Sequence, residues 1–294
     1  MEKIQSALAK ARAERGSVAA QPDRAAALPA RAQTPAPTLD RAAVAAAVAS
    51  QPGPQADVQA AWDALPALTL SPRTIKRNRI VALSGGRDAT GIDMMRTRVL
   101  QQMRDNNWRR LAITSPTAAC GKSTIALNLA MSLQRQPDLR TMLLELDWRR
   151  PSLSRMLGIE KNLHFGQVLA GTAGFADNAL RHGDNLAIAS NQTPMQDAAE
   201  LLGSPKVPQI LNRMEADYAP DLMIFDTPPM LVTDDMMAFA RHVDCVLLVA
   251  GAESTSVKEI DICEQELASQ TNVMGVVLNK CRYMGASHDY GYYE

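Results

Sequence analysis

Hydrophobic positions from Arg73 onward form short apolar runs that alternate with stretches in which apolar residues recur every three or four positions. The short runs are nearly continuous in Val, Leu, Ile and Met, which is typical of strands covered on both faces, and the periodic stretches predict helices. The predicted strands are Ile80–Leu83, Leu111–Thr114, Thr141–Leu146, Leu186–Ala189, Leu222–Phe225, Val243–Val249 and Val273–Leu278. The predicted helices are Asp93–Asp105, Lys122–Arg135, Pro205–Ala216, Thr233–Ala240 and Val257–Gln270. This alternation predicts an α/β fold: a doubly wound, mostly parallel sheet of about seven to eight strands flanked by helices, with ligands at the carboxyl ends of the strands.

The first 72 residues have a different pattern. Residues 1–15 place Ile4 and Leu8 on one helical face with basic residues around it, which predicts an amphipathic helix. Such a helix either packs on its own domain or docks on a partner. Residues 16–72 are rich in Ala, Pro and Gln, with Trp62 as their only aromatic residue, so they predict a disordered, flexible linker. The expected organisation is therefore a helix at 1–15, a linker at 16–72, an α/β domain at 73–282 and a tyrosine-rich tail at 283–294.

Composition narrows the possible partners and compartments. Lys plus Arg and Asp plus Glu each number 31, so the net charge of zero implies no bulk attraction to nucleic acid or membranes. The basic stretch Arg73–Arg79 is interpreted as a solvated hinge, and no nucleic-acid partner is expected. No apolar run approaches the ~20 residues of a membrane span, so we expect a cytoplasmic protein that reaches the membrane only through a partner. The cysteines lack CxxC spacing, which favours a reducing cytosol over a zinc site or disulfide framework; they are Cys120, Cys245, Cys263 and Cys281.

Residues 114–124, Thr-Ser-Pro-Thr-Ala-Ala-Cys-Gly-Lys-Ser-Thr, lie between a predicted strand and a predicted helix. The last four positions match the end of the Walker A motif, whose lysine reaches the β- and γ-phosphates and whose hydroxyl holds Mg²⁺. Lys122 and Ser123 would fill these roles, while backbone N–H groups at the start of the helix would bind phosphate. Pro116 stands where the motif has its first glycine, so a surface turn is the alternative interpretation.

Two predicted strands end in carboxylates. Asp147 follows the run that begins at Thr141, and Asp226 follows the run that begins at Leu222. An ionised Asp at the end of a buried strand needs a cation or hydrogen-bond donors, although either residue alone could be a helix N-cap. Since both fall at the sheet edge where the phosphate loop opens, they predict a shared Mg²⁺–nucleotide site, with Asp226 in the Walker B role.

Four segments in order resemble the bacterial tyrosine autokinases that control capsule and exopolysaccharide synthesis. Leu-Asp147-Trp-Arg-Arg-Pro151 is similar to their Walker A′ motif, and Asp226-Thr-Pro-Pro229, with Val232-Thr-Asp234 after it, is similar to their Walker B motif. Ala199-Glu-Leu-Leu-Gly-Ser204 and Gly275-Val-Val-Leu-Asn-Lys280 also resemble family segments, so that the similarity covers roughly residues 80–294.

The resemblance implies an ATP- and Mg²⁺-dependent protein tyrosine kinase of the P-loop NTPase fold. It implies that Asp147 is a Mg²⁺ ligand and the base for an attacking tyrosine, and that Asn279 lies by the adenine. It also implies a homo-oligomer, a membrane adaptor or co-polymerase of a polysaccharide export system that recruits the kinase to the inner face of the membrane, and a cognate tyrosine phosphatase. The expected catalytic residues are Lys122, Asp147 and Asp226; the expected metal ligands are Ser123, Asp147 and Asp226; the expected nucleotide contacts are Ala119, Cys120, Gly121, Lys122, Ser123, Thr124 and Asn279.

Tyrosines are concentrated at the end of the chain. Four of the five lie within the last twelve residues, and Tyr218 is the exception. They predict a phosphoacceptor tail that enters a neighbouring subunit's site, where each added phosphate brings a charge of about −2; a sticky or disordered tail is the alternative. The predicted acceptors are Tyr283, Tyr290, Tyr292 and Tyr293.

Two segments depart from the family pattern. The loop has Ala118, Ala119 and Cys120 where the family has Pro, Gly and Glu; Ala at a position of positive φ costs about 1 kcal/mol. Either the loop has shifted or nucleotide binding is weakened. Cys120, beside Lys122 at a helix N-terminus, is expected to have a lowered thiol pKa, so that alkylation blocks ATP binding and ATP protects it.

The oligomerisation helix departs as well. The family's Glu-x-x-Arg-x-x-Arg becomes Asp93, Arg96 and Arg98 here, which rotates the last arginine by about 100°. A ring contact through these residues is expected to be altered, and an ordinary solvated charged face is the alternative.

Two other functions compete with the kinase. A partitioning-type positioning ATPase shares the fold but usually carries a lysine five residues before the Walker lysine, where Thr117 stands here. A nucleotide-sensing scaffold that binds ATP without phosphotransfer would accommodate Ala119 and Cys120.

Overall fold

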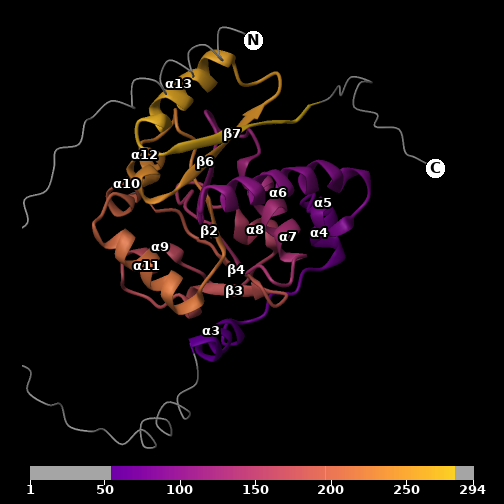
Figure 1. The fold of residues 1–294 in the computed structure, drawn as a ribbon, viewed down its shortest axis with the longest axis vertical. Coiled ribbons are helices and arrows are strands. Elements are labelled where there is room, and N and C mark those ends of the chain that lie inside the picture. The colour runs from indigo at the N-terminus through magenta and orange to yellow at the C-terminus, as the bar shows by residue number, and fades with distance from the viewer. Residues whose placement is uncertain (1–53, 196, 282–294) are drawn as a thin grey trace, which may run out of the picture. The chain divides into compact units, whose positions relative to one another are not determined.

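The computed structural model describes residues 54–195 and 197–281. The predicted helix at 1–15, most of the predicted linker and the tyrosine-rich tail lie outside the described residues. Seven strands form one sheet in the order β3-β4-β2-β5-β1-β6-β7, and every pair is parallel except β3 with β4 (Figure 1). The strands are β1 (Arg110–Thr114), β2 (Thr141–Glu145), β3 (Ala179–His182), β4 (Leu186–Ala189), β5 (Leu222–Asp226), β6 (Cys245–Gly251) and β7 (Asn272–Asn279). The predicted doubly wound, mostly parallel sheet is confirmed.

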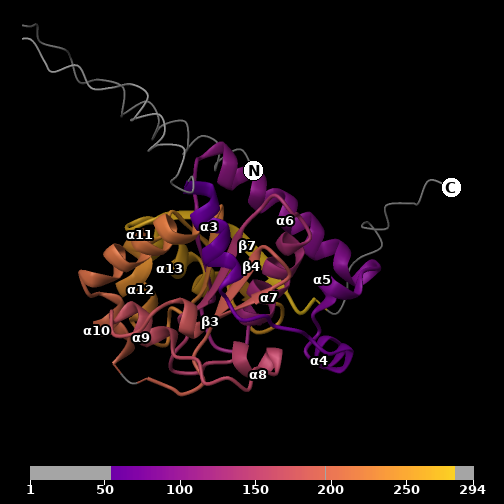
Figure 2. The same ribbon diagram turned by 90° about the horizontal axis from the view of Figure 1, so that it is seen from below.

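Helices cover both faces of the sheet, and the two hydrophobic clusters show which helix belongs to which face (Figure 2). One face is covered by α4 (Pro72–Arg77), α5 (Val81–Ser84), α6 (Arg87–Asp105), α7 (Lys122–Gln134) and α8 (Leu153–Leu157). The other is covered by α3 (Pro54–Asp63), α9 (Phe165–Leu169), α10 (Ala198–Leu202), α11 (Lys206–Tyr218), α12 (Asp235–Phe239) and α13 (Val257–Ala268). Two short 3₁₀ turns, Ala176–Asn178 and Ala240–His242, complete the elements.

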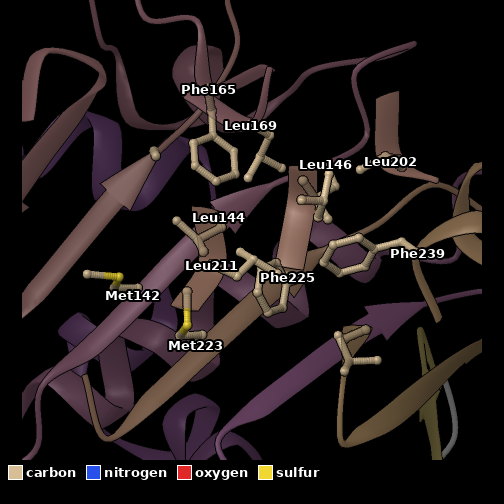
Figure 3. Packing of buried hydrophobic residues seen from close by; sticks show 14 of the residues in the cluster. Met142, Leu144, Leu146, Phe165, Leu169, Leu202, Leu211, Met223, Phe225 and Phe239 are labelled. Atoms are coloured by element: carbon tan, nitrogen blue, oxygen red, sulfur yellow. The ribbon is translucent and has the colours of Figure 1, made fainter. Parts of the chain in front are cut away.

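Successive residues of the central strands enter opposite clusters. In β2, Met142 and Leu144 pack on the α9–α11 side, as Figure 3 shows, while Leu143 between them belongs to the α6–α7 side. In β5, Phe225 lies beside Phe239 with ring centroids 4.9 Å apart. Full burial of such a side chain contributes about 1.5–3 kcal/mol, and burial on both faces is the reason that these strands read as continuous apolar runs.

Three of the strand assignments made from the sequence differ from the structure. Residues 80–83, predicted as a strand, lie at and within α5, because a four-residue apolar run carries no period that separates strand from helix. Buried Ile80 packs in the α6–α7 cluster, and the backbone N–H of Ala82 donates to Asn128 Oδ1 on α7 (3.1 Å). β6 begins at Cys245, two residues later than predicted, and the short antiparallel strand β3 was not predicted.

The predicted linker is also wrong from residue 54 onward, where the chain folds onto the domain. Trp62 is fully buried, its indole N–H donates to the carbonyl oxygen of Tyr218 (2.7 Å), and the two rings meet edge to face. Farther on, the Leu68 N–H donates to the Arg181 carbonyl (2.7 Å), and Ala67 forms a parallel bridge with Arg181. This segment therefore covers the outer edge of β3, which would otherwise expose unpaired backbone groups.

Candidate nucleotide and phosphate site

The phosphate loop joins β1 to α7 and begins its helix with Gly121. Gly121 has φ +95°, and no side chain caps the helix, so its first N–H groups are left for a ligand. Ala119 has φ +64°, in the left-handed region that costs an L-residue about 1–2 kcal/mol. Of the two possibilities for this loop, the structure has the strained one: the loop keeps the backbone conformation that suits glycine and places alanine in it.

The end of β7 is tied to the same loop. The Asn279 amide Nδ2 donates to the Cys120 carbonyl (2.9 Å). The positive φ of Gly121 strains any residue with a Cβ, and a Cβ there would also displace that amide group from the loop. Asn279 is thus placed beside the loop by the strand at the sheet edge.

Lys122 lies between the two predicted carboxylates. Its Nζ is 2.6 Å from Asp147 Oδ2 and 3.7 Å from Asp226 Oδ1, and it donates to Ser123 Oγ at 3.4 Å. β2 and β5 are hydrogen-bonded neighbours, and the N–H groups of Leu146 and Asp147 both donate to the Asp226 carbonyl, which fixes the two carboxylates together. The sheet therefore assembles the predicted catalytic set at one point of its carboxyl edge.

Burial dominates the electrostatics of this cluster. It lowers the pKa of Lys122, but the charges of Asp226 and Asp147 outweigh it, so the net pKa is above the usual value. Burial raises the pKa of Asp226, and nearby Lys122 only partly offsets that effect. Both side-chain oxygens of Asp226 are buried and have no hydrogen-bond partner among the described residues.

These orphaned oxygens test whether a magnesium ion fits. A buried carboxylate without donors is costly, and a hard cation would satisfy it. Within residues 54–195 and 197–281 no group of three His, Cys, Asp or Glu could hold a metal by itself. Mg²⁺ accepts one or two carboxylates with water and phosphate oxygens as the remaining ligands, so Asp226, Ser123 and Asp147 fit it as part of a nucleotide site.

The family follows from comparison with known proteins. The model described as "ParA: NUBPL iron-transfer P-loop NTPase" matches residues 107–291. This chain belongs to the ParA family of P-loop NTPases. The match covers the phosphate loop, both carboxylates and β7, so the predicted P-loop NTPase fold is confirmed.

Individual relatives narrow the position within the ParA family. The putative tyrosine-protein kinase AmsA of Erwinia amylovora is 28% identical over 228 residues, 76% of this chain and 31% of AmsA. The putative tyrosine-protein kinase CapB of Staphylococcus aureus is 26% identical over 201 residues, 68% of this chain and 87% of CapB. The chain thus spans about a third of the length of AmsA and most of that of CapB.

Solved structures similar to this chain are also tyrosine kinase domains. The kinase domain of the Escherichia coli tyrosine kinase ETK matches with TM-score 0.61 and 25% identity, covering 70% of this chain and 80% of that one. The VpsO kinase domain matches with TM-score 0.57 and 27% identity, covering 65% and 94%. The resemblance to bacterial tyrosine kinases is therefore confirmed.

Glu145 also lies in this site, although the sequence analysis did not predict it as a site residue. It ends β2, is fully buried, and accepts hydrogen bonds from the N–H groups of Ser152, Leu153 (2.8 Å) and Asn191 (3.1 Å). Burial raises its pKa to about 7 despite these donors. Its role is to fix the segment after Asp147. A charged residue inside an otherwise apolar strand was the available signal.

Arg149 and Asp235 form a second connection that was missed. Arg149 Nε and Nη2 donate to the two carboxylate oxygens of Asp235 at 2.7 and 3.0 Å, and Asp235 is fully buried. This bidentate pair joins the loop after β2 to the start of α12. Since the partners are 86 residues apart in sequence, local spacing gave no signal for it.

The predicted oligomerisation residues separate into two groups. Asp93 Oδ1 accepts from Ser132 Oγ (2.6 Å), Arg135 (3.0 Å) and Arg96 (3.2 Å), so Asp93 and Arg96 bind the neighbouring helix α7. Arg98 is exposed. It lines a groove of about 780 Å³ between α6 and β7, which opens beside the phosphate loop at Gly121, Thr124 and Asn279.

Cys120 is buried within the loop. Its Sγ lies 3.3 Å from the Thr117 carbonyl oxygen and 3.5 Å from Thr255 Oγ1. Burial raises its pKa, but hydrogen bonds from Thr255 and Thr117 outweigh burial, so the thiol pKa is below its usual value. The expected direction of the shift thus agrees, while its main cause is the two threonines and not Lys122.

Proposed function

We propose that the chain is an ATP-dependent protein tyrosine autokinase that phosphorylates its C-terminal tyrosines in trans. The observation that carries the proposal is the buried Lys122–Asp147–Asp226 cluster, set beside a phosphate loop in a chain similar to tyrosine kinases along its domain. The tyrosine kinases in these comparisons provide the reaction class, and the site provides the groups that the reaction needs.

In the proposed reaction, a tyrosine Oη–phosphorus bond forms while the bond between the γ-phosphorus and its bridging oxygen breaks, releasing ADP. The tyrosine proton passes to Asp147. Lys122 exchanges its contact with Asp147 for the β- and γ-phosphates and neutralises their charge. Mg²⁺, held by Ser123 and Asp226 with Asp147, would supply further charge neutralisation on the phosphates.

The proposed place for the nucleoside is the groove end formed by Gly121, Thr124 and Asn279. The groove volume of about 780 Å³ falls within the range of small-molecule sites. The backbone of Ala119 and Cys120 completes the proposed nucleotide contacts. Strain at Ala119 favours weaker binding than glycine would give.

The proposed setting is capsule or exopolysaccharide polymerisation and export. Partners would be a membrane adaptor, further copies of the chain in an oligomer to which Arg98 contributes, and a cognate tyrosine phosphatase. The kinase would act in the cytoplasm at the inner face of the membrane. Among the described residues no helix is long and apolar enough to span a bilayer.

Two alternatives have specific support. Membership of the ParA family favours a positioning ATPase, and the strained Ala119 favours an ATP-binding scaffold. Incubation with ATP and Mg²⁺, with phosphotyrosine and released phosphate measured together, separates them. Phosphotyrosine that disappears in a folded Lys122→Met variant supports the kinase. Phosphate release without phosphotyrosine supports the ATPase, and nucleotide binding with neither supports the scaffold. Each measurement is repeated with the co-expressed membrane adaptor.

A further inference from the structure

Thr255 connects the segment that follows β6 to the phosphate loop. It lies two residues before α13 and is half-buried, and its Oγ1 accepts a hydrogen bond from the N–H of Gly251, the last residue of β6 (2.9 Å). The same oxygen lies 3.5 Å from Cys120 Sγ in the phosphate loop. A Cβ at position 251 would lie 3.6 Å from Cys120 Cα, so the two segments are in direct contact.

The direction of the hydrogen bonds at this contact follows from the groups involved. The Thr117 carbonyl oxygen, 3.3 Å from Cys120 Sγ, can only accept, so it takes the thiol proton. The Gly251 N–H donates to the Thr255 oxygen, which leaves the Thr255 hydroxyl proton to point at the Cys120 sulfur. Burial raises the pKa of this thiol, and the hydrogen bond from Thr255 is the first of the contacts that bring the pKa below its usual value.

The backbone of Cys120 is attached to the same segment by a second route. The Cys120 carbonyl accepts from Asn279 Nδ2 (2.9 Å), and the Asn279 carbonyl accepts from the Ala252 N–H (2.8 Å). The side chain of Cys120 is therefore held through Thr255, and its backbone is held through the end of β7. Two attachments fix the orientation of a residue, whereas a single one would let the loop pivot about it.

We infer that Thr255 is a positioning residue for the nucleotide: it holds Cys120 so that the neighbouring Ala119 stays in its left-handed conformation and the phosphate loop keeps its shape. This inference rests on the proposed function. Ala119 has φ +64°, and such a strained backbone persists only where its surroundings hold it in place. A glycine at this position would adopt the same φ without support. The contact from Thr255 thus compensates for the alanine.

The experiment measures the affinity of the full chain for a non-hydrolysable ATP analogue with Mg²⁺ by calorimetry. Thr255→Val removes the hydroxyl and should weaken binding about fivefold, while Thr255→Ser keeps the hydroxyl and should bind like wild type. Thr271→Val is the matched control, because Thr271 is also half-buried, follows α13 and donates to the Val243 carbonyl (2.8 Å). Denaturant unfolding should show a loss of stability in both valine variants, and only Thr255→Val should lose affinity.

The dependence on Ala119 separates positioning from a general loss of stability. In an Ala119→Gly background, Thr255→Val should change the affinity by less than about twofold, because the two residues act on the same backbone conformation. Thr255→Val should also shift the pH profile of Cys120 alkylation to higher pH, since the sulfur loses a donor. A change that only lowers stability would move neither result.

The outcomes distinguish this inference from the proposed function. Equal affinity in wild type and folded Thr255→Val overturns the inference, as does the same loss with alanine or glycine at position 119. If Thr255→Val does not fold, Cys120→Ala removes the other partner of the contact and should weaken binding to the same extent; unchanged affinity in that variant also overturns the inference. A wild-type chain that binds no ATP analogue contradicts the proposed function and removes the basis of the inference with it.

Discussion

Lys122 Nζ lies 2.6 Å from Asp147 Oδ2, so the residue that should bind phosphate is held by the carboxylate that should accept the tyrosine proton. Lys122 and Asp147 therefore remain paired with each other until a nucleotide binds. In the proposed reaction, phosphate binding withdraws the lysine from Asp147 and frees the carboxylate Oδ2 to accept the tyrosine proton. Nucleotide binding and activation of the base are thereby one event at this pair.

Replacing Lys122 with Met should therefore affect both function and stability. ATP binding is lost, and the free energy of unfolding at neutral pH falls by about 3–5 kcal/mol because Asp147 and buried Asp226 lose their cation. The loss should shrink at lower pH, since the raised pKa of Asp226 lets it take up a proton. Denaturant unfolding with circular dichroism measures this, and Lys161→Met, at an exposed position, is the control. Equal unfolding free energies for wild type and Lys122→Met would contradict a stabilising role.

Asp93 should stabilise the α6–α7 contact in a pH-dependent way. Burial raises its pKa, but hydrogen bonds from Ser132 and Arg135 and the arginine charges outweigh this and lower it. A lowered folded pKa contributes stability that is present above the unfolded pKa and is lost as pH falls through the folded value. Asp93→Asn should cost about 1–2 kcal/mol at pH 7, and that cost should disappear as the pH falls through the lowered pKa of folded Asp93.

The matched variant for this measurement is Asp261→Asn, exposed in the interior of α13. Its unfolding free energy should follow that of wild type at every pH. A cost of Asp93→Asn that stays the same from pH 7 down to the acid limit of the folded state would show that the ionised carboxylate is not what stabilises the contact.

Cys120 and Cys281 should differ in their reaction with alkylating reagents. Cys281 is exposed, whereas only 1% of Cys120 is exposed. Mass spectrometry should find Cys281 modified first and Cys120 slowly, despite its lowered pKa, because access limits the reaction. ATP should slow modification of Cys120 alone, and alkylation there should abolish ATP binding. Equal rates at Cys120 with and without ATP would show that nucleotide does not cover the loop.

Local pattern was sufficient for the parallel strands β1, β2, β4, β5, β6 and β7 and for the site's two acids. Strands buried on both faces read as continuous apolar runs, and Asp147 and Asp226 follow two of them, so parallel pairing alone brings them together. Apart from the short run at 80–83, the errors discussed above include segments that are defined by a distant partner. Trp62 sits in an Ala- and Pro-rich stretch, and its hydrogen-bond partner Tyr218 is 156 residues away. Arg149 and Asp235 are likewise far apart in sequence and form their ion pair between two different loops.

Removing the contact between Trp62 and Tyr218 measures how much it contributes to the free energy of unfolding. Trp62→Ala should lower the free energy of unfolding by about 3–5 kcal/mol, because the indole is fully buried against Tyr218. Trp62→Phe should cost less, since it keeps a ring but loses the hydrogen bond to the Tyr218 carbonyl. Denaturant unfolding compares them with Asp63→Ala, whose side chain is 58% exposed. If Trp62→Ala unfolded like the control, residues 54–72 would be a tether after all.

Ala119 provides the sharpest test of the phosphate loop, because its neighbour is a matched control. Ala119 has φ +64°, whereas Ala118 is not among the residues of positive φ. Ala119→Gly should leave stability unchanged or raise the free energy of unfolding by up to about 1 kcal/mol, since relief of strain exceeds the added entropy of the unfolded chain. Ala118→Gly has only the entropic effect and should lower that free energy by about 0.5–1 kcal/mol. A loss of stability in Ala118→Gly but not in Ala119→Gly, with tighter ATP binding by Ala119→Gly alone, is the expected pair of results. The same loss of stability in both variants would mean that the loop relaxes around alanine and that nucleotide affinity is limited elsewhere.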